Sequence, residues 1–292
     1  MNKVKKLLAA VITGTMILGG FAGCSKSAST TTDNKGQATK AASSIDEIKS
    51  RGKIKIGVFS DKAPFGYVDS NGENQGFDVY IAKRFAKDLL GDESKVEFVL
   101  VDAASRVAYL ESKKVDIIMA NFTVTDERKE KVDFANPYMK VSLGIASPDN
   151  AKITSVDQLK GKKLIVAKGT TAETYATKNL PDVELVKFDQ YTEIFQAMLD
   201  GRGDALLSDN TEVLAWVKDN PGFSVGVATL GSQDTIAPAV TKGNKELLDW
   251  INNELVELGK EDFVHKAYDA TLESVYGAEF KDSLVVEGGK VE

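Results

Sequence analysis

Residues 115–128 read Val115-Asp116-Ile117-Ile118-Met119-Ala120-Asn121-Phe122-Thr123-Val124-Thr125-Asp126-Glu127-Arg128. The apolar run that ends at Ala120 predicts a short buried strand. A polar segment follows, and the charged residues after Thr125 predict the start of a helix. In an open α/β sheet, ligands bind beyond the carboxyl ends of the strands. The polar residues after this strand are therefore candidate binding residues.

The same alternation of strand and helix continues on both sides of this segment. The polar and apolar alternation of residues 53–59 predicts an exposed-edge strand, and Asp78 is placed to cap a helix over residues 79–90. Further strands are expected at 96–101, 163–167, 184–188, 205–207 and 224–227, and further helices at 106–113, 172–179, 192–199, 211–218 and 245–258. This order predicts an α/β fold of parallel sheets with helices on both faces.

The composition favours a binding protein over an enzyme. Lys and Arg total 37 against 43 Asp and Glu, and the resulting net charge of −6 argues against nucleic acid as a partner. The chain has one Cys, Cys24, and one His, His265. These counts exclude a disulfide framework, a metal site built on Cys and His, and most His-dependent catalysis. We therefore expect no metal ligands, no cofactor and no catalytic residues.

The first residues form a targeting segment. Lys3, Lys5 and Lys6 precede an apolar stretch with the length of a signal-peptide core, and the sequence Phe21-Ala22-Gly23-Cys24 resembles the lipobox of bacterial lipoproteins. This resemblance implies a signal peptide over residues 1–23 and lipidation of Cys24. Residues 24–44 are rich in Ser and Thr and predict a flexible tether. An uncleaved anchor helix is the alternative, and both put the folded part outside the cytoplasm.

Polar clusters follow the predicted strands in both halves of the chain. They comprise residues 59–65, 102–106, 120–128, 168–171 and 208–210. Because these positions lie at the carboxyl ends of strands, they predict one pocket between two lobes.

These clusters, in their order and spacing, resemble the polar amino-acid-binding proteins of bacterial ABC importers (solute-binding protein family 3). The similarity covers Ile45 to about Tyr276 and is greatest to cysteine-binding members, through residues 58–67 and 120–125. It implies a two-lobe, type II periplasmic-binding-protein-like fold with two crossover strands. Lobe 1 would comprise residues 45–141 plus 239–276, lobe 2 residues 142–238, and a C-terminal tail residues 277–292.

The resemblance also implies a set of ligand-binding residues. Arg128 would clamp the ligand carboxylate with its two-donor fork, and the main-chain N–H groups of Thr123 and Thr171 would assist. Asp209 would accept the ligand ammonium group. The full set is Phe59, Lys62, Phe65, Arg106, Asn121, Thr123, Arg128, Thr170, Thr171 and Asp209.

At the side-chain end, this sequence departs from many family members. Phe59 stands where they carry an acidic residue, and Lys62 and Ala103 stand at two usual aromatic positions. The lost carboxylate argues against Lys, Arg or His as the ligand. Lys62 and the nearby Arg106 favour a thiolate, a carboxylate or a neutral polar group.

Each site residue also has a structural alternative. Arg128 could be a solvated helix residue, and Asp209, Thr170 and Thr171 could be ordinary helix caps. Arg106 could lie on the surface or brace the two lobes. Phe59 and Phe65 could serve only in packing.

The resulting prediction is a monomeric lipoprotein, not an enzyme, anchored on the outer face of the cytoplasmic membrane or in the periplasm. It would capture a free L-amino acid by hinge closure, cysteine first and then glutamate or aspartate, and deliver it to an ABC permease. One alternative is a cyclohexadienyl dehydratase-like enzyme on the same fold, which would need a positioned general acid or base. The other is an amino-acid sensor for a signalling partner.

Overall fold

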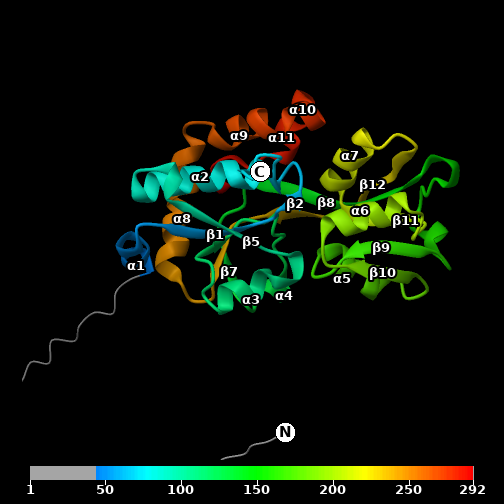
Figure 1. The fold of residues 1–292 in the computed structure, drawn as a ribbon, viewed down its shortest axis with the longest axis horizontal. Helices are drawn as coiled ribbons and strands as arrows, with labels where there is room; N and C mark the ends of the chain where they lie inside the picture. Colours follow the sequence, from blue (N-terminus) through cyan, green and yellow to red (C-terminus); the bar gives the residue numbers. More distant parts are fainter. Residues whose placement is uncertain (1–43, 292) are drawn as a thin grey trace, which may run out of the picture. The chain divides into compact units, whose positions relative to one another are not determined.

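The computed structural model describes residues 44–291. The predicted signal peptide, Cys24 and the predicted tether up to residue 43 lie outside these residues. The described part contains two five-stranded sheets and a small three-stranded sheet. We call the first large sheet with its helices lobe 1 and the second with its helices lobe 2 (Figure 1). No helix between residues 44 and 291 has the length and apolar character that crossing a bilayer requires.

Lobe 1 is built on a sheet with the strand order β5-β1-β6-β13-β7. Its strands are β1 (Ile54–Val58), β5 (Val96–Leu100), β6 (Ile117–Ile118), β7 (Val132–Phe134) and β13 (Ala239–Thr241). The small sheet of β2 (Asp61–Lys62), β3 (Gly66–Val68) and β4 (Asn74–Gln75) lies between β1 and α2 in the chain. β1 pairs in parallel with both β5 and β6, so the prediction of an exposed edge strand is wrong. Its alternation arises because Lys55 is half-buried between buried Ile54 and Ile56.

Helices cover the lobe 1 sheet and bury its apolar residues. They are α1 (Ser44–Arg51), α2 (Phe77–Leu90), α3 (Arg106–Glu111), α4 (Asp126–Lys129), α8 (Lys245–Gly259) and α9 (Phe263–Thr271). In α2 the buried face includes Ile81, Phe85 and Leu89, as the helical spacing predicts. Consecutive residues of the β6 segment alternate between two core clusters, with Ile117 in one and Ile118 in the other.

Lobe 2 has the strand order β10-β9-β11-β8-β12. Its strands are β8 (Met139–Pro148), β9 (Lys163–Ala167), β10 (Glu184–Phe188), β11 (Ala205–Asp209) and β12 (Phe223–Ile236), and its helices are α5 (Thr171–Asn179), α6 (Tyr191–Leu199) and α7 (Asn210–Asp219). β9 is parallel to β10 and β11, whereas β8 is antiparallel to β11 and β12. Both large sheets are therefore mixed, because β13 of lobe 1 is also antiparallel to its neighbours. The prediction of purely parallel sheets is wrong.

Two long strands connect the lobes. β8 and β12 pair antiparallel from Pro148 opposite Phe223 to Met139 opposite Ile236. Figure 1 shows both strands running from the lobe 2 sheet toward lobe 1. The α/β architecture with two connecting strands agrees with the expected fold. The exact lobe boundaries, 45–141 plus 239–276 and 142–238, remain a proposal.

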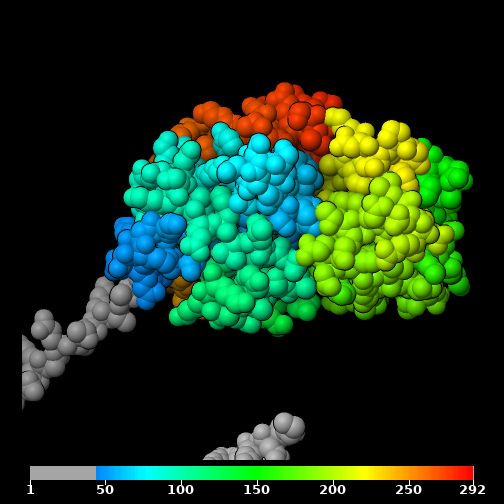
Figure 2. Space-filling model, in the orientation of Figure 1, coloured from blue at the N-terminus to red at the C-terminus, as the bar shows by residue number. Residues whose placement is uncertain are grey.

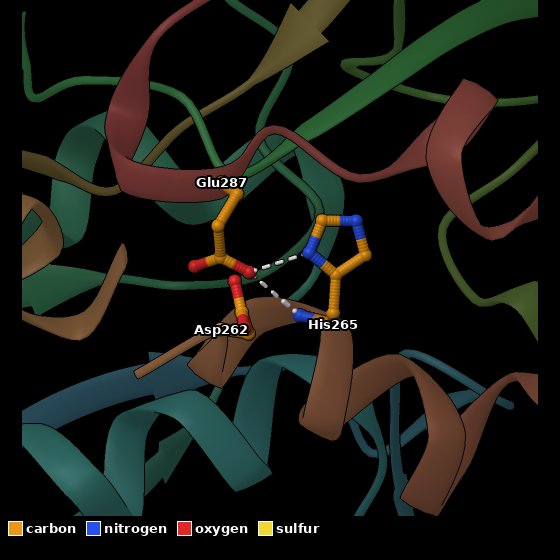
Figure 3. A group of neighbouring side chains, drawn as sticks. All are labelled: Asp262, His265 and Glu287. Carbon is orange, nitrogen blue, oxygen red and sulfur yellow. Dashed lines mark hydrogen bonds and ion pairs between the residues drawn. The ribbon is translucent and has the colours of Figure 1, made fainter. Parts of the chain in front are cut away.

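The C-terminal tail packs against lobe 1 after α10 (Glu273–Tyr276) and α11 (Lys281–Leu284). The Glu287 carboxylate accepts hydrogen bonds from the main-chain N–H groups of Val264 and His265, at the start of α9. It also lies 2.7 Å from His265 Nδ1 (Figure 3). Val285 forms a β-bridge with Met139, the first residue of β8. His265 therefore has a structural contact that holds the tail beside a connecting strand.

Candidate functional site

Side chains of the two lobes meet along a surface that we call the seam (Figure 2). Hydrogen bonds and ion pairs cross it from the loops of lobe 1 to the helix starts of lobe 2. Asp61 of β2, for example, accepts hydrogen bonds from the main-chain N–H groups of Tyr191 and Thr192 at the start of α6. A carboxylate at this position satisfies amides that have no partner within the helix. The seam therefore joins a loop of lobe 1 to the start of a lobe 2 helix.

Lys62 reaches across the seam and is fully buried. Its ammonium group donates to Asp209 Oδ2 at 2.8 Å and to the Tyr191 hydroxyl at 3.0 Å. It also lies 3.2 Å from Glu212 Oε2. Burial alone lowers the pKa of Lys62, but Asp209, Tyr191 and Glu212 together raise it well above its usual value. Lys62 is thus a protonated counter-ion held by lobe 2.

Asp209 ends β11 and occupies the N-cap position of α7, but its side chain makes no capping hydrogen bond. The alternative role of an ordinary cap is therefore wrong, because the carboxylate binds Lys62 instead. Glu212, one turn further along α7, is fully buried, and burial raises its pKa to about 7 although Lys62 lowers it. Glu212 was not among the residues predicted from the sequence. Its i, i+3 spacing from Asp209 is the signal that would have placed both carboxylates on one face.

Arg106 is buried, and its guanidinium donates hydrogen bonds to main-chain carbonyl groups. It donates to Ala103 O, Ala120 O and Asn121 O within lobe 1, and to Gly169 O of lobe 2 at 3.1 Å. The alternative of a surface helix residue is wrong, and the alternative of a brace between the lobes is confirmed by this contact.

Arg128 is half-buried and is not a solvated helix residue, because its guanidinium donates to Thr123 O at 2.7 Å and to Gly169 O at 2.9 Å. The guanidinium groups of Arg106 and Arg128 both lie over the Phe122 ring, 4.4 and 4.6 Å from its centroid. Burial, and next the positive charge of Arg106, lower the pKa of Arg128 to about 9. Within residues 44–291, no carboxylate oxygen lies within 4.0 Å of either guanidinium group.

Asn121 and Thr123 follow β6 and are buried beside these guanidinium groups. Asn121 adopts a positive φ of 41°, and its main-chain N–H donates to Asp78 Oδ2 at 2.7 Å. Its side-chain amide has no hydrogen-bond partner among the described residues. A buried amide without a partner is costly, so it is available to a bound polar group.

Asp78 holds the Asn121 loop from behind. The sequence predicts it as a helix cap, but α2 begins one residue earlier and the cap position belongs to Gly76. The Asp78 carboxylate is instead buried and accepts a hydrogen bond from the Tyr138 hydroxyl at 2.6 Å. Burial raises its pKa to about 7. The cap prediction is wrong because the carboxylate faces inward from the first turn.

The segment from Gly169 to Thr171 brings the start of α5 to the seam. The Thr170 hydroxyl accepts a hydrogen bond from Glu173 N at 3.2 Å, which confirms the cap alternative for Thr170. Thr171 is the first residue of α5. Gly169 has a φ of +72°, and a Cβ there would lie 2.4 Å from Ala104 Cα of lobe 1. Glycine is therefore required for this close approach of the lobes.

The two aromatic residues of the predicted set are fully buried. The Phe59 ring lies 5.3 Å from the Tyr191 ring of lobe 2 in an edge-to-face arrangement, and Phe65 packs in the lobe 1 core. A cavity of about 650 Å³ opens at the seam, and Phe122, Arg128, Gly169 and Thr171 are among its lining residues. Of the predicted set, Arg128 and Thr171 line this cavity. The buried Phe59 ring lies near both the Lys62 ammonium and the Arg106 guanidinium, 5.6 and 5.5 Å from its centroid, so cationic groups lie toward Gly169 and carboxylates lie around Lys62. Such an arrangement can bind a small molecule that carries charges of both signs.

Comparisons with known proteins agree with this geometry. Residues 54–272 match the family model of bacterial extracellular solute-binding proteins, family 3. The ABC transporter glutamine-binding protein GlnH of Bacillus subtilis is 34% identical over 245 residues, which are 80% of this chain and 88% of that protein.

Two solved structures are more similar in sequence. A cysteine-binding protein from Campylobacter jejuni is 56% identical with a TM-score of 0.83, over 84% of this chain and 99% of that one. A solute receptor for L-cysteine of Neisseria gonorrhoeae is 56% identical with a TM-score of 0.82, over 83% and 99%. These matches confirm the predicted two-lobe, type II periplasmic-binding-protein-like fold. With its fold and the match over residues 54–272, this chain belongs to family 3 of the bacterial extracellular solute-binding proteins.

Proposed function

We propose that this protein captures a free amino acid between its lobes, cysteine first and glutamate or aspartate second, and delivers it to an ABC permease. As a family 3 solute-binding protein it is a binding protein and not an enzyme, in agreement with the sequence prediction. The alternative of a cyclohexadienyl dehydratase-like enzyme is therefore wrong.

The observation that carries this proposal is the convergence of two guanidinium groups on one carbonyl oxygen. Arg106 and Arg128 both donate to Gly169 O, at 3.1 and 2.9 Å. A carbonyl oxygen carries only a partial charge and cannot balance two cations. A ligand carboxylate would bind the same donors in a bidentate manner and supply the missing negative charge.

The ammonium group of the ligand has a partner on the opposite lobe. Asp209 is buried at the carboxyl end of β11, and its carboxylate already binds one ammonium group, that of Lys62. We assign the ligand ammonium to Asp209 as well, with the unpaired Asn121 amide and the Thr123 hydroxyl as further partners. The Thr171 N–H at the start of α5 adds a donor for the carboxylate, and the remaining proposed contacts are Phe59, Lys62, Phe65 and Thr170.

The preference for cysteine rests on relatives and on pocket chemistry together. Both solved cysteine-binding structures are 56% identical to this chain, against 34% for the glutamine-binding relative. The side-chain end offers Phe59, Tyr191 and Lys62, a small and partly aromatic wall. The carboxylates of Asp209 and Glu212 both contact Lys62, and Asp209 is assigned the ligand ammonium as well, so neither is free to neutralise the side chain of a lysine or arginine ligand.

We further propose that Cys24 is lipidated and anchors the protein outside the cytoplasm. Family membership supports an extracytoplasmic location, and the sequence Phe21-Ala22-Gly23-Cys24 supports the anchor. Mass spectrometry of the mature protein should find an acylated N-terminal Cys24. An intact Met1 or an unmodified Cys24 would disprove the anchor without affecting ligand binding.

A thermal-shift screen of the common amino acids in reducing buffer tests the ligand, and calorimetry tests the site. Arg128→Ala should fold normally and lose about 3–5 kcal/mol of binding free energy, the range for removing one partner of a buried charge pair. The adjacent and exposed Lys129 gives a matched control, since Lys129→Ala should bind as the wild type does. Near-normal binding by Arg128→Ala, or a preference for arginine or histidine, would refute the assignment.

A further inference from the structure

Buried charge in the described part of this protein is concentrated in one place. Its fully buried charged side chains are Lys62, Asp78, Arg106, Asp209 and Glu212. All of them lie at the seam or, for Asp78, directly behind it. The half-buried side chains of Arg128 and Asp61 lie at the same seam.

Among the buried carboxylates of this group, Asp209 is assigned to the ligand ammonium, and Asp78 binds the Asn121 N–H and the Tyr138 hydroxyl. Glu212 is the carboxylate that remains without an assigned role. It comes from α7 of lobe 2, and its Oε2 lies 3.2 Å from Lys62 Nζ, outside hydrogen-bond geometry. Asp209 lies closer to the same ammonium group, at 2.8 Å. If Asp209 also binds the ligand ammonium, Lys62 needs a second counter-charge, and Glu212 is the carboxylate in contact with it.

We propose that Glu212 selects the charge of the ligand side chain. By neutralising Lys62, it restricts the site to amino acids with an uncharged side chain, such as cysteine in its thiol form, and disfavours aspartate and glutamate. This inference rests on the proposed function and narrows its second choice.

The physical reason is the charge around Lys62. Two carboxylates, Asp209 and Glu212, already contact its one ammonium group, and a zwitterionic ligand with a neutral side chain adds no net charge to them. An anionic side chain would add a further negative charge beside the same cation, and a buried charge without a counter-ion is costly. Lys62 cannot offset that charge, because its three nearest polar partners, Tyr191, Asp209 and Glu212, already surround it.

The test compares cysteine with aspartate as ligands of the wild-type chain and of charge variants, by calorimetry in reducing buffer at about pH 7.5, where both ligands are mainly in their usual ionisation states. Glu212→Gln keeps the size of the side chain and removes its charge. We expect the ratio of the aspartate Kd to the cysteine Kd to fall about tenfold or more in this variant. Lys62 would then keep only Asp209 as a counter-charge, and Asp209 also binds the ligand ammonium. Lys62→Met should move the ratio in the opposite direction, and the double variant Lys62→Met/Glu212→Gln should return it toward the wild-type value.

Glu193→Gln provides a matched control, because Glu193 lies exposed in the first turn of the neighbouring helix α6. Its ratio should equal that of the wild type. An unchanged ratio in Glu212→Gln would overturn the inference and leave the proposed function intact. Wild-type protein that binds no amino acid would overturn both. If Glu212→Gln does not fold, Lys62→Met and the double variant decide, since a double variant that keeps the ratio of Lys62→Met also contradicts the inference.

Discussion

At the scale of single residues, the partners of a buried cation decide whether it can bind an anionic ligand group. Lys62 and Arg106 are both buried cations, yet Lys62 binds carboxylates and Arg106 binds carbonyl oxygens. Arg106 therefore keeps an unbalanced positive charge, whereas Lys62 does not. A buried cation without a carboxylate partner favours the binding of an anion. The position of each partner, more than the residue type, decides which end of the ligand each side chain can hold.

Asp78 yields a prediction for stability against pH. Its folded-state pKa of about 7 lies above its unfolded value of 3.8, because the carboxylate is fully buried. The folded state therefore binds this proton more tightly, and the contribution of Asp78 is fully present below pH 3.8 and is lost as pH rises through 7. Asp78→Asn cannot titrate, and its amide can donate to Tyr138 while its oxygen accepts from Asn121. The wild-type free energy of unfolding minus that of Asp78→Asn should thus fall by up to about 4 kcal/mol across this window.

Urea unfolding at several pH values measures this difference. The exposed Asp126→Asn, on α4, is the control and should show no such fall. A difference that stays constant or rises between pH 4 and pH 7 would contradict the assigned direction of the Asp78 shift.

At the scale of elements, the loop between β9 and α5 determines how closely the lobes approach. Gly169 and Gly161 share a left-handed backbone, with φ of +72° and +73°. A Cβ at Gly169 would meet Ala104 of lobe 1, whereas a Cβ at Gly161 has nothing within 4 Å. Because the two glycines share this left-handed conformation, both alanine variants should lose similar stability, about 1 kcal/mol from backbone strain. Gly169→Ala alone should lower ligand affinity, about tenfold or more, because the lobes can no longer meet.

Calorimetric titration together with thermal unfolding separates the two effects. Equal affinities in Gly169→Ala and Gly161→Ala would show that the approach of Gly169 to Ala104 does not accompany binding. A loss of affinity in both variants would point to backbone strain as the cause.

Some helices and strands were predictable from the sequence and others were not. Helices such as α8 were predictable because apolar residues recur on one face over four turns, and Lys245 begins it as expected. The direction of β8 was not predictable, since strand direction depends on where the chain returns in space and not on periodicity. The burial of Glu212 and Asp78 was not predictable either, because it also depends on which segments the fold brings together. Their neighbours in sequence read as ordinary helix starts, and only the opposite lobe or Tyr138 makes them interior groups.

At the scale of the whole molecule, charged contacts join the lobes at the seam. One core cluster contains residues of both lobes, including Phe59 and Ile194, so apolar packing also crosses the seam. Buried ion pairs contribute little net stability, because desolvation offsets their attraction. Contact between the lobes should thus depend on the charge that a ligand supplies to Arg106 and Arg128.

This dependence predicts that the ligand carboxylate, and not the thiol or the amine, drives compaction. Saturating cysteine should lower the radius of gyration measured by small-angle X-ray scattering, since hinge closure around a ligand brings the lobes together. Cysteamine carries the same amine and thiol but has no carboxylate, so at equal concentration it should leave the scattering unchanged. Arg128→Ala should respond to cysteine only weakly, because the loss of the guanidinium removes the group that the carboxylate binds. Equal compaction by cysteine and cysteamine would mean that the amine and thiol contacts close the lobes, and the guanidinium pair would lose its assigned role.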